Sequence, residues 1–308
     1  MLDLTGPAEL RNKISLICLV FFLSFGTTCA QELEARSYSV VPVGMHTAAV
    51  SYTYSKGNVI SDMVSPIQDL NVTTSAINTG YVQTFSLFNK LSRIQVAVPY
   101  GFLNGSAKVF GEDTSGSRVG FLDTKIKFGV NLIGSPVLTP KEYRLFQEQT
   151  VFGVSFVVSV PTGQYFPTKL INLGTNRWGF KPEIGFSHRE GRLYYELYTG
   201  VWFFTLNDEF FNKTTLSESP LITFQAHIDY VFKSAMWLAV NVGVANGGES
   251  SISGTEQNDQ ERNWRLGATY SVPINRHQSV KAMVNTGVAT RAGQNYTAVT
   301  LAYQYTWF

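Results

Sequence analysis

The stretch Asn295-Tyr-Thr-Ala-Val-Thr-Leu-Ala-Tyr-Gln-Tyr-Thr-Trp-Phe308 carries the pattern that decides the fold class. From Val299 to Trp307 every second residue is apolar or aromatic, and small or polar residues stand between them. Successive side chains of a β-strand point to opposite faces, so a period of two predicts an amphipathic strand. A helix would scatter the same residues around its circumference.

The same alternation recurs along most of the sequence. In residues 221–230, Ile222, Phe224 and Ile228 alternate with Thr223, Gln225 and His227. Counting such segments predicts about twelve strands of roughly 10 residues, the length that a tilted strand needs to cross a membrane. The expected strands are residues 46–54, 79–88, 92–102, 118–132, 149–160, 176–188, 192–205, 221–232, 236–245, 262–272, 278–290 and 295–308.

The connections between these segments alternate between short and long. Short turns are expected at residues 89–91, 190–191, 233–235 and 273–277, and longer polar loops at 55–78, 103–117, 161–175, 206–220 and 246–261. Tight turns at one end and larger loops at the other are typical of outer-membrane barrels. Two connections depart from this pattern, since 134–149 is long and 292–294 is short.

Composition is consistent with a membrane barrel. Charged residues make up 15% of the chain and aromatic residues 14%, with a formal net charge of +2, whereas soluble domains average roughly 25% charged residues. A near-neutral charge points to no nucleic-acid partner. After residue 25 no apolar run is long enough for a membrane-spanning helix. We therefore expect an all-β, transmembrane, antiparallel up-and-down β-barrel of about 12 strands over residues 46–308.

A soluble β-sandwich is the competing fold, because its strands alternate as well. The end of the chain favours the barrel. An amphipathic last strand that closes on an aromatic residue, here Phe308, resembles the signal that the bacterial barrel-insertion machinery reads. In that signal the apolar residues are in phase with the terminal Phe, whereas here they are one residue out of phase.

The first 30 residues have the parts of a secretory signal peptide. Arg11 and Lys13 precede an apolar run over residues 14–25, and small residues follow up to Ala30. We expect cleavage after Ala30; a lipoprotein site at Cys29 is the alternative. Both cysteines, Cys18 and Cys29, lie in this segment, so the mature chain is expected to be free of thiols. Export and a barrel together predict the outer membrane of a Gram-negative cell, with residues 31–45 in the periplasm or in the lumen.

The polar faces of the central strands supply the candidate lumen residues. Arg or Lys facing lipid near the midplane costs about 2–4 kcal/mol, so charged residues should face inward and pair across strands. Lys181 or Arg177 pairing with Glu196 is one expectation. The set either lines a conduit for a small solute or forms a charge network that fills a narrow barrel. The candidates are Asp123, Lys125, Lys127, Arg177, Lys181, Glu183, Tyr194, Glu196, Tyr198, Trp202, Gln225, His227, Asp229, Arg265 and Lys281.

Motifs for catalysis and for cofactors are missing from the sequence. It contains no Gly-x-Ser-x-Gly segment and no His-Glu-x-x-His segment. His227 and Asp229 share a strand face, which leaves a barrel hydrolase as a distant alternative. We expect no enzyme, no cofactor and no metal site.

Several motifs resemble one known family. They are Val160-Pro-Thr-Gly-Gln-Tyr165, Asn172-Leu-Gly-Thr-Asn-Arg-Trp-Gly-Phe-Lys-Pro-Glu183, Val201-Trp-Phe-Phe-Thr-Leu-Asn207, Asn246-Gly-Gly248, Arg265-Leu-Gly-Ala-Thr-Tyr270 and Gly287-Val-Ala-Thr-Arg291. Together they resemble the outer-membrane transporter family named for the meta-pathway of phenol degradation, from about Val43 to the C-terminus. The resemblance implies a barrel that handles small aromatic or hydrophobic compounds. We expect a passive channel in contact with outer-membrane lipid, and a structural or surface-interaction barrel is the alternative.

Overall fold

The computed structural model describes residues 33–57, 67–109, 112–169, 171–292 and 295–308 of the 308-residue chain. The predicted signal peptide lies outside these residues. The elements are β1 (His46–Gly57), β2 (Ile67–Leu87), β3 (Lys90–Val109), β4 (Glu112–Phe121), β5 (Thr124–Ile133), α2 (Pro140–Tyr143), β6 (Thr150–Val160), β7 (Gly179–Glu190), β8 (Leu193–Phe204), β9 (Asn207–Phe210), β10 (Thr214–Glu218), β11 (Leu221–Val231), β12 (Trp237–Gly247), β13 (Ser250–Ile252), β14 (Thr255–Glu256), β15 (Glu261–Pro273), β16 (Gln278–Ala289) and β17 (Tyr296–Trp307).

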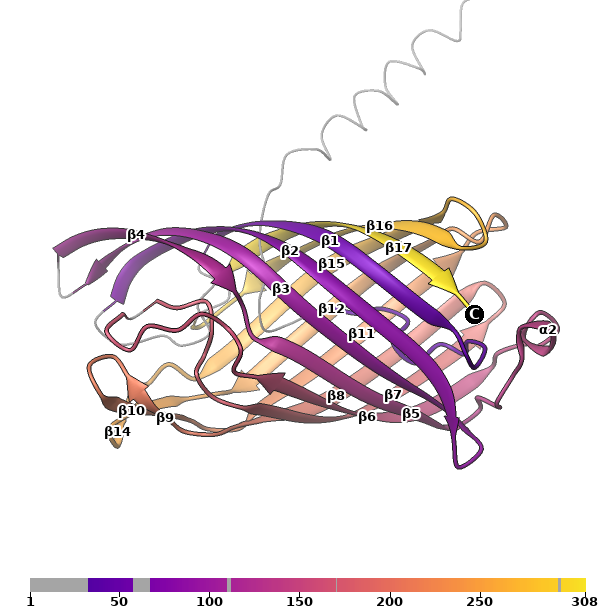
Figure 1. The fold of residues 1–308 in the computed structure, drawn as a ribbon, viewed down its shortest axis with the longest axis horizontal. Helices are drawn as coiled ribbons and strands as arrows, with labels where there is room; N and C mark the ends of the chain where they lie inside the picture. Colours follow the sequence, from indigo (N-terminus) through magenta and orange to yellow (C-terminus); the bar gives the residue numbers. More distant parts are fainter. Residues whose placement is uncertain (1–32, 58–66, 110–111, 170, 293–294) are drawn as a thin grey trace, which may run out of the picture.

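The long strands form one closed antiparallel barrel (Figure 1). They follow the order β2-β1-β17-β16-β15-β12-β11-β8-β7-β6-β5-β3-β4, and the pairing of β2 with β3 closes the ring. Strands β4 and β5 pair with successive parts of β3, so they occupy one wall position that is interrupted at Leu122 and Asp123. The barrel therefore has 12 strands, as predicted.

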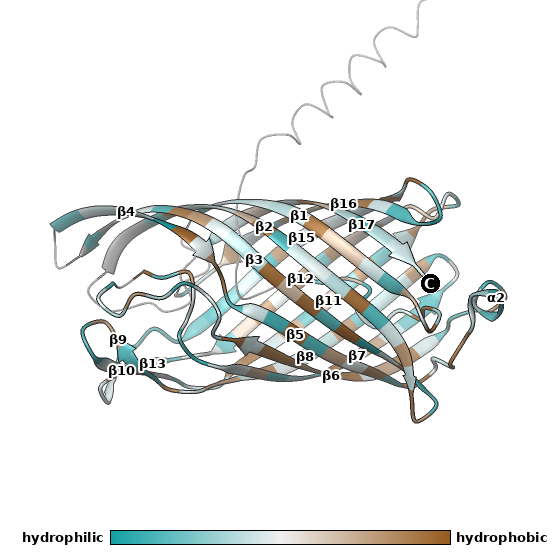
Figure 2. Cartoon of the chain, in the orientation of Figure 1, coloured by the Kyte–Doolittle hydropathy of each residue, from teal (hydrophilic) through white to brown (hydrophobic). Residues whose placement is uncertain are grey.

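The two faces of the wall have the polarity that the alternation predicted. Along β11, Ile222, Phe224 and Ile228 are exposed, whereas His227 and Asp229 are buried. Figure 2 shows hydrophobic and hydrophilic residues interspersed along the wall strands. An apolar outer face with a polar interior is the polarity of a membrane barrel and the inverse of a soluble sandwich. Among the described residues, no helix is long and apolar enough to cross a membrane.

The connections at the two ends of the barrel differ in size. Tight turns join β2 to β3 and β7 to β8, and the long connection at residues 134–149, which holds α2, lies at this same end. At the other end, β9, β10, β13 and β14 form a small separate sheet. By this asymmetry the short-turn end is the periplasmic end and the small sheet is external.

Two predicted loops are wrong. Residues 67–78 and 103–109, expected in loops, belong to β2 and β3, which pair with each other from Ile67 and Val109 down to the turn. Residues 112–117 likewise lie in β4, paired with β3. These stretches are rich in Ser, Thr, Gly and Asn and lack an apolar outer face, because the strands extend beyond the apolar band of the wall.

The last strand closes the barrel against the first, with Trp307 opposite His46 and Tyr296 opposite Gly57. Its outer face carries Leu301, Tyr303 and Tyr305, all exposed. The Trp307 ring stacks on His46 with ring centroids 5.5 Å apart, and Phe308 follows the end of the strand and is 60% exposed. The outward-facing residues of this strand therefore end at Trp307, one position before the terminal Phe308. This is the one-residue phase difference seen in the sequence.

Candidate channel lumen

Thirteen of the fifteen candidate lumen residues lie on wall strands, and they point inward. Strand β8 illustrates why: Tyr194, Glu196, Tyr198 and Trp202 fall on one face and are buried, while Leu197 between them is exposed. Because successive side chains of a strand point to opposite faces, every second residue of β8 places a polar or aromatic side chain inside the barrel. The thirteen are Lys125, Lys127, Lys181, Glu183, Tyr194, Glu196, Tyr198, Trp202, Gln225, His227, Asp229, Arg265 and Lys281.

Asp123 and Arg177 lie off the strands. The Asp123 carboxylate accepts the backbone N–H groups of Gly163 and Thr175, each at 2.9 Å, and the Thr175 hydroxyl at 2.7 Å. Arg177 precedes β7, and its guanidinium pairs with Glu218 of β10. Both residues therefore hold external loops against the barrel mouth.

The predicted pairing of Lys181 or Arg177 with Glu196 is wrong. Lys181 Nζ lies 2.7 Å from a carboxylate oxygen of Glu183, two residues along its own strand. Glu196 instead accepts the backbone N–H of Arg36 at 2.6 Å. The pairing changed because a segment near the N-terminus lies in the lumen and takes Glu196 as a partner.

Residues 33–45, hereafter the N-terminal segment, run through the lumen to the short-turn end. Backbone N–H groups of Glu34 and Ser37 donate to Gln225 Oε1 at 3.3 Å and to the Tyr198 hydroxyl at 3.1 Å. At the rim, the Val43 N–H donates to the Leu138 carbonyl at 2.9 Å. The sequence left open whether this segment lies in the lumen or the periplasm; these contacts place it inside the barrel.

The Tyr38 ring occupies a slot in the wall made by two glycines. Gly153 of β6 and Gly185 of β7 are direct partners in the sheet. A Cβ atom at Gly185 would lie 2.1 Å from Tyr38 Cε2, and one at Gly153 would lie 2.5 Å from Tyr38 Cδ1. The Tyr38 hydroxyl contacts Ser155 Oγ at 2.9 Å and donates to Glu183 Oε1 at 3.2 Å. Only glycine at both positions lets the ring lie against the wall.

Arg93 of β3 also holds the N-terminal segment, and sequence reasoning missed it. Its guanidinium donates to the carbonyl oxygens of Ser37 and Ser39, and Asn131 Nδ2 donates to the Tyr38 carbonyl at 2.9 Å. The alternation of Ile94 and Val96 with Arg93 and Gln95 would have placed Arg93 on the inner face.

Glu148 fixes the same segment from the loop between β5 and β6. Its Oε1 accepts the Val40 N–H at 3.2 Å. Burial raises the pKa of this carboxyl group above its ordinary value. Glu148 precedes β6 with no local pattern to single it out, so nothing in the sequence indicated its role.

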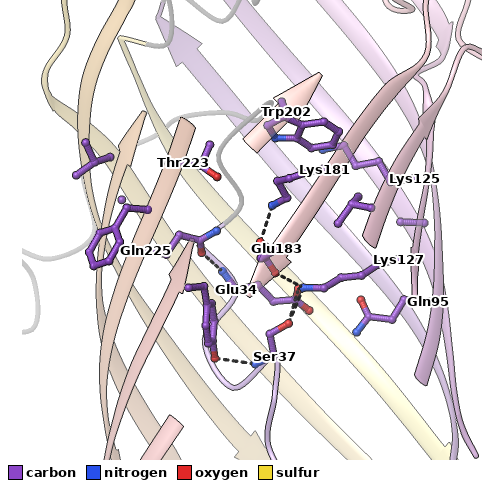
Figure 3. Close-up of a pocket in the computed structure, with 16 residues that line it drawn as sticks. Glu34, Ser37, Gln95, Lys125, Lys127, Lys181, Glu183, Trp202, Thr223 and Gln225 are labelled. Carbon is purple, nitrogen blue, oxygen red and sulfur yellow. Dashed lines mark hydrogen bonds and ion pairs between the residues drawn. The ribbon is translucent and has the colours of Figure 1, made fainter. Parts of the chain in front are cut away.

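A cavity of ≈ 90 Å³ lies in the lumen above the N-terminal segment, on the external side (Figure 3). Lys127 Nζ lies 3.2 Å from a Glu183 oxygen and 3.6 Å from a Glu34 oxygen, and it donates to the Ser37 hydroxyl at 2.7 Å. The ion pairs thus join wall strands β5 and β7 to the N-terminal segment and form the floor of the cavity.

An external loop packs inside the end of the barrel that lies opposite the short turns. Ile171 and Leu173, from the connection between β6 and β7, pack on Val72, Leu103 and Tyr296, which face inward from β2, β3 and β17. This apolar cluster lies inside the rim of the barrel. The external end of the lumen therefore holds an apolar loop cluster on one side of the wall, and the periplasmic end holds the N-terminal segment.

His227 belongs to a polar ladder across three strands. His227 Nδ1 lies 2.8 Å from Asn241 Oδ1, and Asn241 Nδ2 donates to the Thr269 hydroxyl at 3.1 Å. These contacts run sideways through the inner wall, and no serine takes part in them. In the part of the chain that the structure describes, no three His, Cys, Asp or Glu side chains are grouped as metal ligands.

Comparisons with known structures agree with this architecture. The crystal structure of the COG4313 outer membrane channel from Pseudomonas putida F1 matches with a TM-score of 0.76 and 19% identity, covering 90% of this chain and 100% of that one. The β domain of the Bordetella autotransporter BrkA matches with a TM-score of 0.51 and 10% identity, covering 86% and 100%. No curated protein matches the chain significantly. The fold of the chain is therefore the closed β-barrel seen in the COG4313 outer membrane channel.

A family model described as "Putative MetA-pathway of phenol degradation" matches residues 49–307, nearly the whole barrel from β1 to β17. The chain belongs to this family.

Proposed function

We propose that this protein is a passive diffusion channel for small aromatic or hydrophobic compounds in the outer membrane of a Gram-negative cell. The observation that carries the proposal is the lumen cavity, which polar and aromatic side chains line inside a closed barrel. A barrel with a purely structural role needs no such cavity. The family description adds a link to phenol degradation, and phenol is itself a small aromatic compound.

Passage requires the N-terminal segment to move or loosen, because it fills the periplasmic end of the lumen. Its anchors include backbone hydrogen bonds that Tyr198 and Glu196 accept, those that Arg93 donates, the Lys127–Glu34 ion pair and the Tyr38 ring in its slot. A neutral hydrogen bond contributes about 0.5–1.5 kcal/mol and one to a charged group about 1.5–3 kcal/mol. None of these contacts is a hydrogen bond between paired strands, so the segment can leave the wall without breaking the strand pairing, as an internal gate would.

Export and insertion form part of the proposal. Residues 1–30 act as a signal peptide that is removed after Ala30, and the N-terminal segment, residues 33–45, enters the lumen once β1 to β17 have closed. The barrel-insertion machinery reads the last strand, whose outward row ends at Trp307 and is followed by Phe308. The lumen residues, from Lys125 to Lys281, form the conduit wall.

A structural or surface-interaction barrel is the second candidate. The length of β2 and β3, which extend beyond the apolar band, and the small external sheet favour it, since they present a polar surface outside the membrane. This reading predicts a barrel that passes no solute.

Solute flux into liposomes separates the two readings. Vesicles carrying the refolded protein should take up phenol and catechol faster than protein-free vesicles. They should take up a trisaccharide no faster, because it is several times larger than a single aromatic ring. Equal rates for vesicles with and without protein, for every solute, would overturn the channel proposal in favour of the structural reading.

A further inference from the structure

The Arg36 side chain of the N-terminal segment occupies a place on the inner wall between two aromatic rings. Its guanidinium carbon lies 4.3 Å from the centroid of the Tyr194 ring of β8 and 5.7 Å from that of the Trp237 ring of β12. Aromatic faces attract cations, because the face of the ring carries negative charge density. The wall therefore holds the cationic head of the segment partly by its rings.

Two buried carboxyl groups lie beside these rings. Asp229 of β11 is the direct partner of Tyr194 in the sheet, and Glu196 follows Tyr194 by two residues on the inner face of β8. Asp229 is fully buried and Glu196 is 1% exposed. Within the described part of the chain, three of their four oxygen atoms, Asp229 Oδ1 and Oδ2 and Glu196 Oε1, have no hydrogen-bond partner. Buried acceptors without donors, next to two ring faces, favour a ligand that is a cation and carries N–H groups.

Arg36 fits this place imperfectly. Its charge is attracted to Glu196 and Asp229, but its guanidinium donates no hydrogen bond to those three oxygen atoms. Its backbone has a φ of 67°, in the left-handed region that is unfavourable for an arginine. A free cation is not constrained by the path of the backbone. It can cover the same rings and also turn its N–H donors toward the carboxyl oxygens.

The neighbouring charges limit the charge of such a ligand. Lys281 Nζ of β16 lies 5.5 Å from the centroid of the Trp237 ring. The Arg189 guanidinium of β7 lies 5.4 Å from the centroid of the Tyr194 ring. Both groups repel any further positive charge on the ligand. A monocation, with an ammonium or a guanidinium group as its head, therefore matches the site.

We propose that this place is a binding site for small organic monocations, which Arg36 occupies as a tethered ligand. Its rings are those of Tyr194 and Trp237, and its carboxyl groups are those of Glu196 and Asp229. A monocation that displaces Arg36 frees the N-terminal segment from this part of the wall. The inference rests on the proposed function in one respect, since displacement changes flux only if the barrel conducts; binding itself does not depend on conduction.

Isothermal titration of the detergent-refolded protein measures the site, with benzylamine and benzyl alcohol as probes that differ in charge but little in size. Arg36→Asn removes the tethered cation and places there a residue that tolerates the left-handed backbone. This variant should bind benzylamine roughly tenfold more tightly than the wild type does, because a ring face and a carboxylate become free. Benzyl alcohol should bind both proteins equally. Arg36→Lys keeps a tethered cation, so its affinity for benzylamine should stay close to that of the wild type.

Asp229→Asn, combined with Arg36→Asn, removes a carboxylate at constant size and should abolish the gain in benzylamine affinity. Asp208→Asn in the same background is the matched control, since Asp208 is exposed in the small external sheet. Equal benzylamine affinities of the wild type and Arg36→Asn, or equal effects of Asp229→Asn and Asp208→Asn, would overturn the site.

The wild type gives a second readout in planar bilayers that needs no variant. Benzylamine should prolong its larger conductance level, and benzyl alcohol should not. Equal effects of the two probes on a conducting wild type would refute this inference alone. A protein that gains benzylamine affinity when Arg36 is replaced, yet passes no solute, refutes the channel proposal instead.

Discussion

Replacement of Gly185 by Ala should open the periplasmic end of the lumen. The added Cβ would lie 2.1 Å from Tyr38 Cε2 and 2.3 Å from Cδ2, whereas carbon atoms in contact stay about 3.5–4.0 Å apart. The ring also lies against Gly153, where a Cβ would be 2.5 Å from Cδ1, so it cannot slide along the wall and must lift by at least about 1.4 Å.

Lifting the ring carries its hydroxyl away from Ser155 and Glu183, which it contacts at 2.9 and 3.2 Å. Losing both contacts weakens docking of the N-terminal segment by about 1–3 kcal/mol. That energy corresponds to about a 5- to 150-fold change in the ratio of undocked to docked segment. In planar bilayers, the variant should therefore spend more time at a larger conductance level than the wild type.

Gly80→Ala is the matched control for this experiment. A Cβ there meets the Val96 carbonyl oxygen at 3.7 Å and the Ala49 Cβ at 3.9 Å, which are ordinary contacts. Its conductance should equal that of the wild type. If Gly185→Ala folds, as judged by altered gel migration before boiling, and yet shows unchanged conductance levels and open times, the segment does not gate the pore.

Three further predictions concern the wall, the external sheet and the periplasmic loop. Val240→Arg places a charge on the outer face, where Val240 is 57% exposed. In a denaturant titration in lipid vesicles, it should lower the free energy of unfolding by about 2–4 kcal/mol. Glu218→Ala removes one buried partner of Arg177, so proteolysis around residues 205–220 should become faster. Glu209→Ala, an exposed position in the same loop, should leave the cleavage rate unchanged. Hydrogen bonds from the Thr139 backbone and side chain lower the pKa of Glu142. This cap of α2 therefore stabilises the loop at pH values above the ordinary glutamate pKa, and the stabilisation is lost as the pH falls through the lowered pKa. Thr139→Ala should raise the pKa of Glu142 in a carboxyl NMR titration, and an unchanged pKa would refute the cap.

The face of the barrel wall on which each side chain lies could be predicted from the sequence, because alternate residues of a strand point to opposite faces. Lys127, Glu183 and Glu196 alternate with apolar residues, so their inward direction follows from local pattern. Their partners do not. Glu183 takes Lys127 from β5 and Tyr38 from the N-terminal segment, contacts between residues far apart in the sequence that depend on barrel closure.

Strand ends and the N-terminal segment were the least predictable parts. The external parts of β2 and β3, residues 67–78 and 103–109, have sequences typical of loops because they lack an apolar face, although they pair with each other. The slot at Gly153 and Gly185 could not be anticipated, since a glycine in a strand marks a close approach without naming what approaches. The structure shows that the group that approaches these two glycines is the Tyr38 ring.

Single-channel recording in planar bilayers, on the wild type and on a variant that lacks residues 33–43, measures directly whether the barrel conducts and whether the N-terminal segment limits conduction. We predict discrete conductance steps for the wild type and larger, more persistent steps for the shortened chain, whose periplasmic end is no longer filled. Two correctly folded barrels that both remain sealed at every voltage would contradict it.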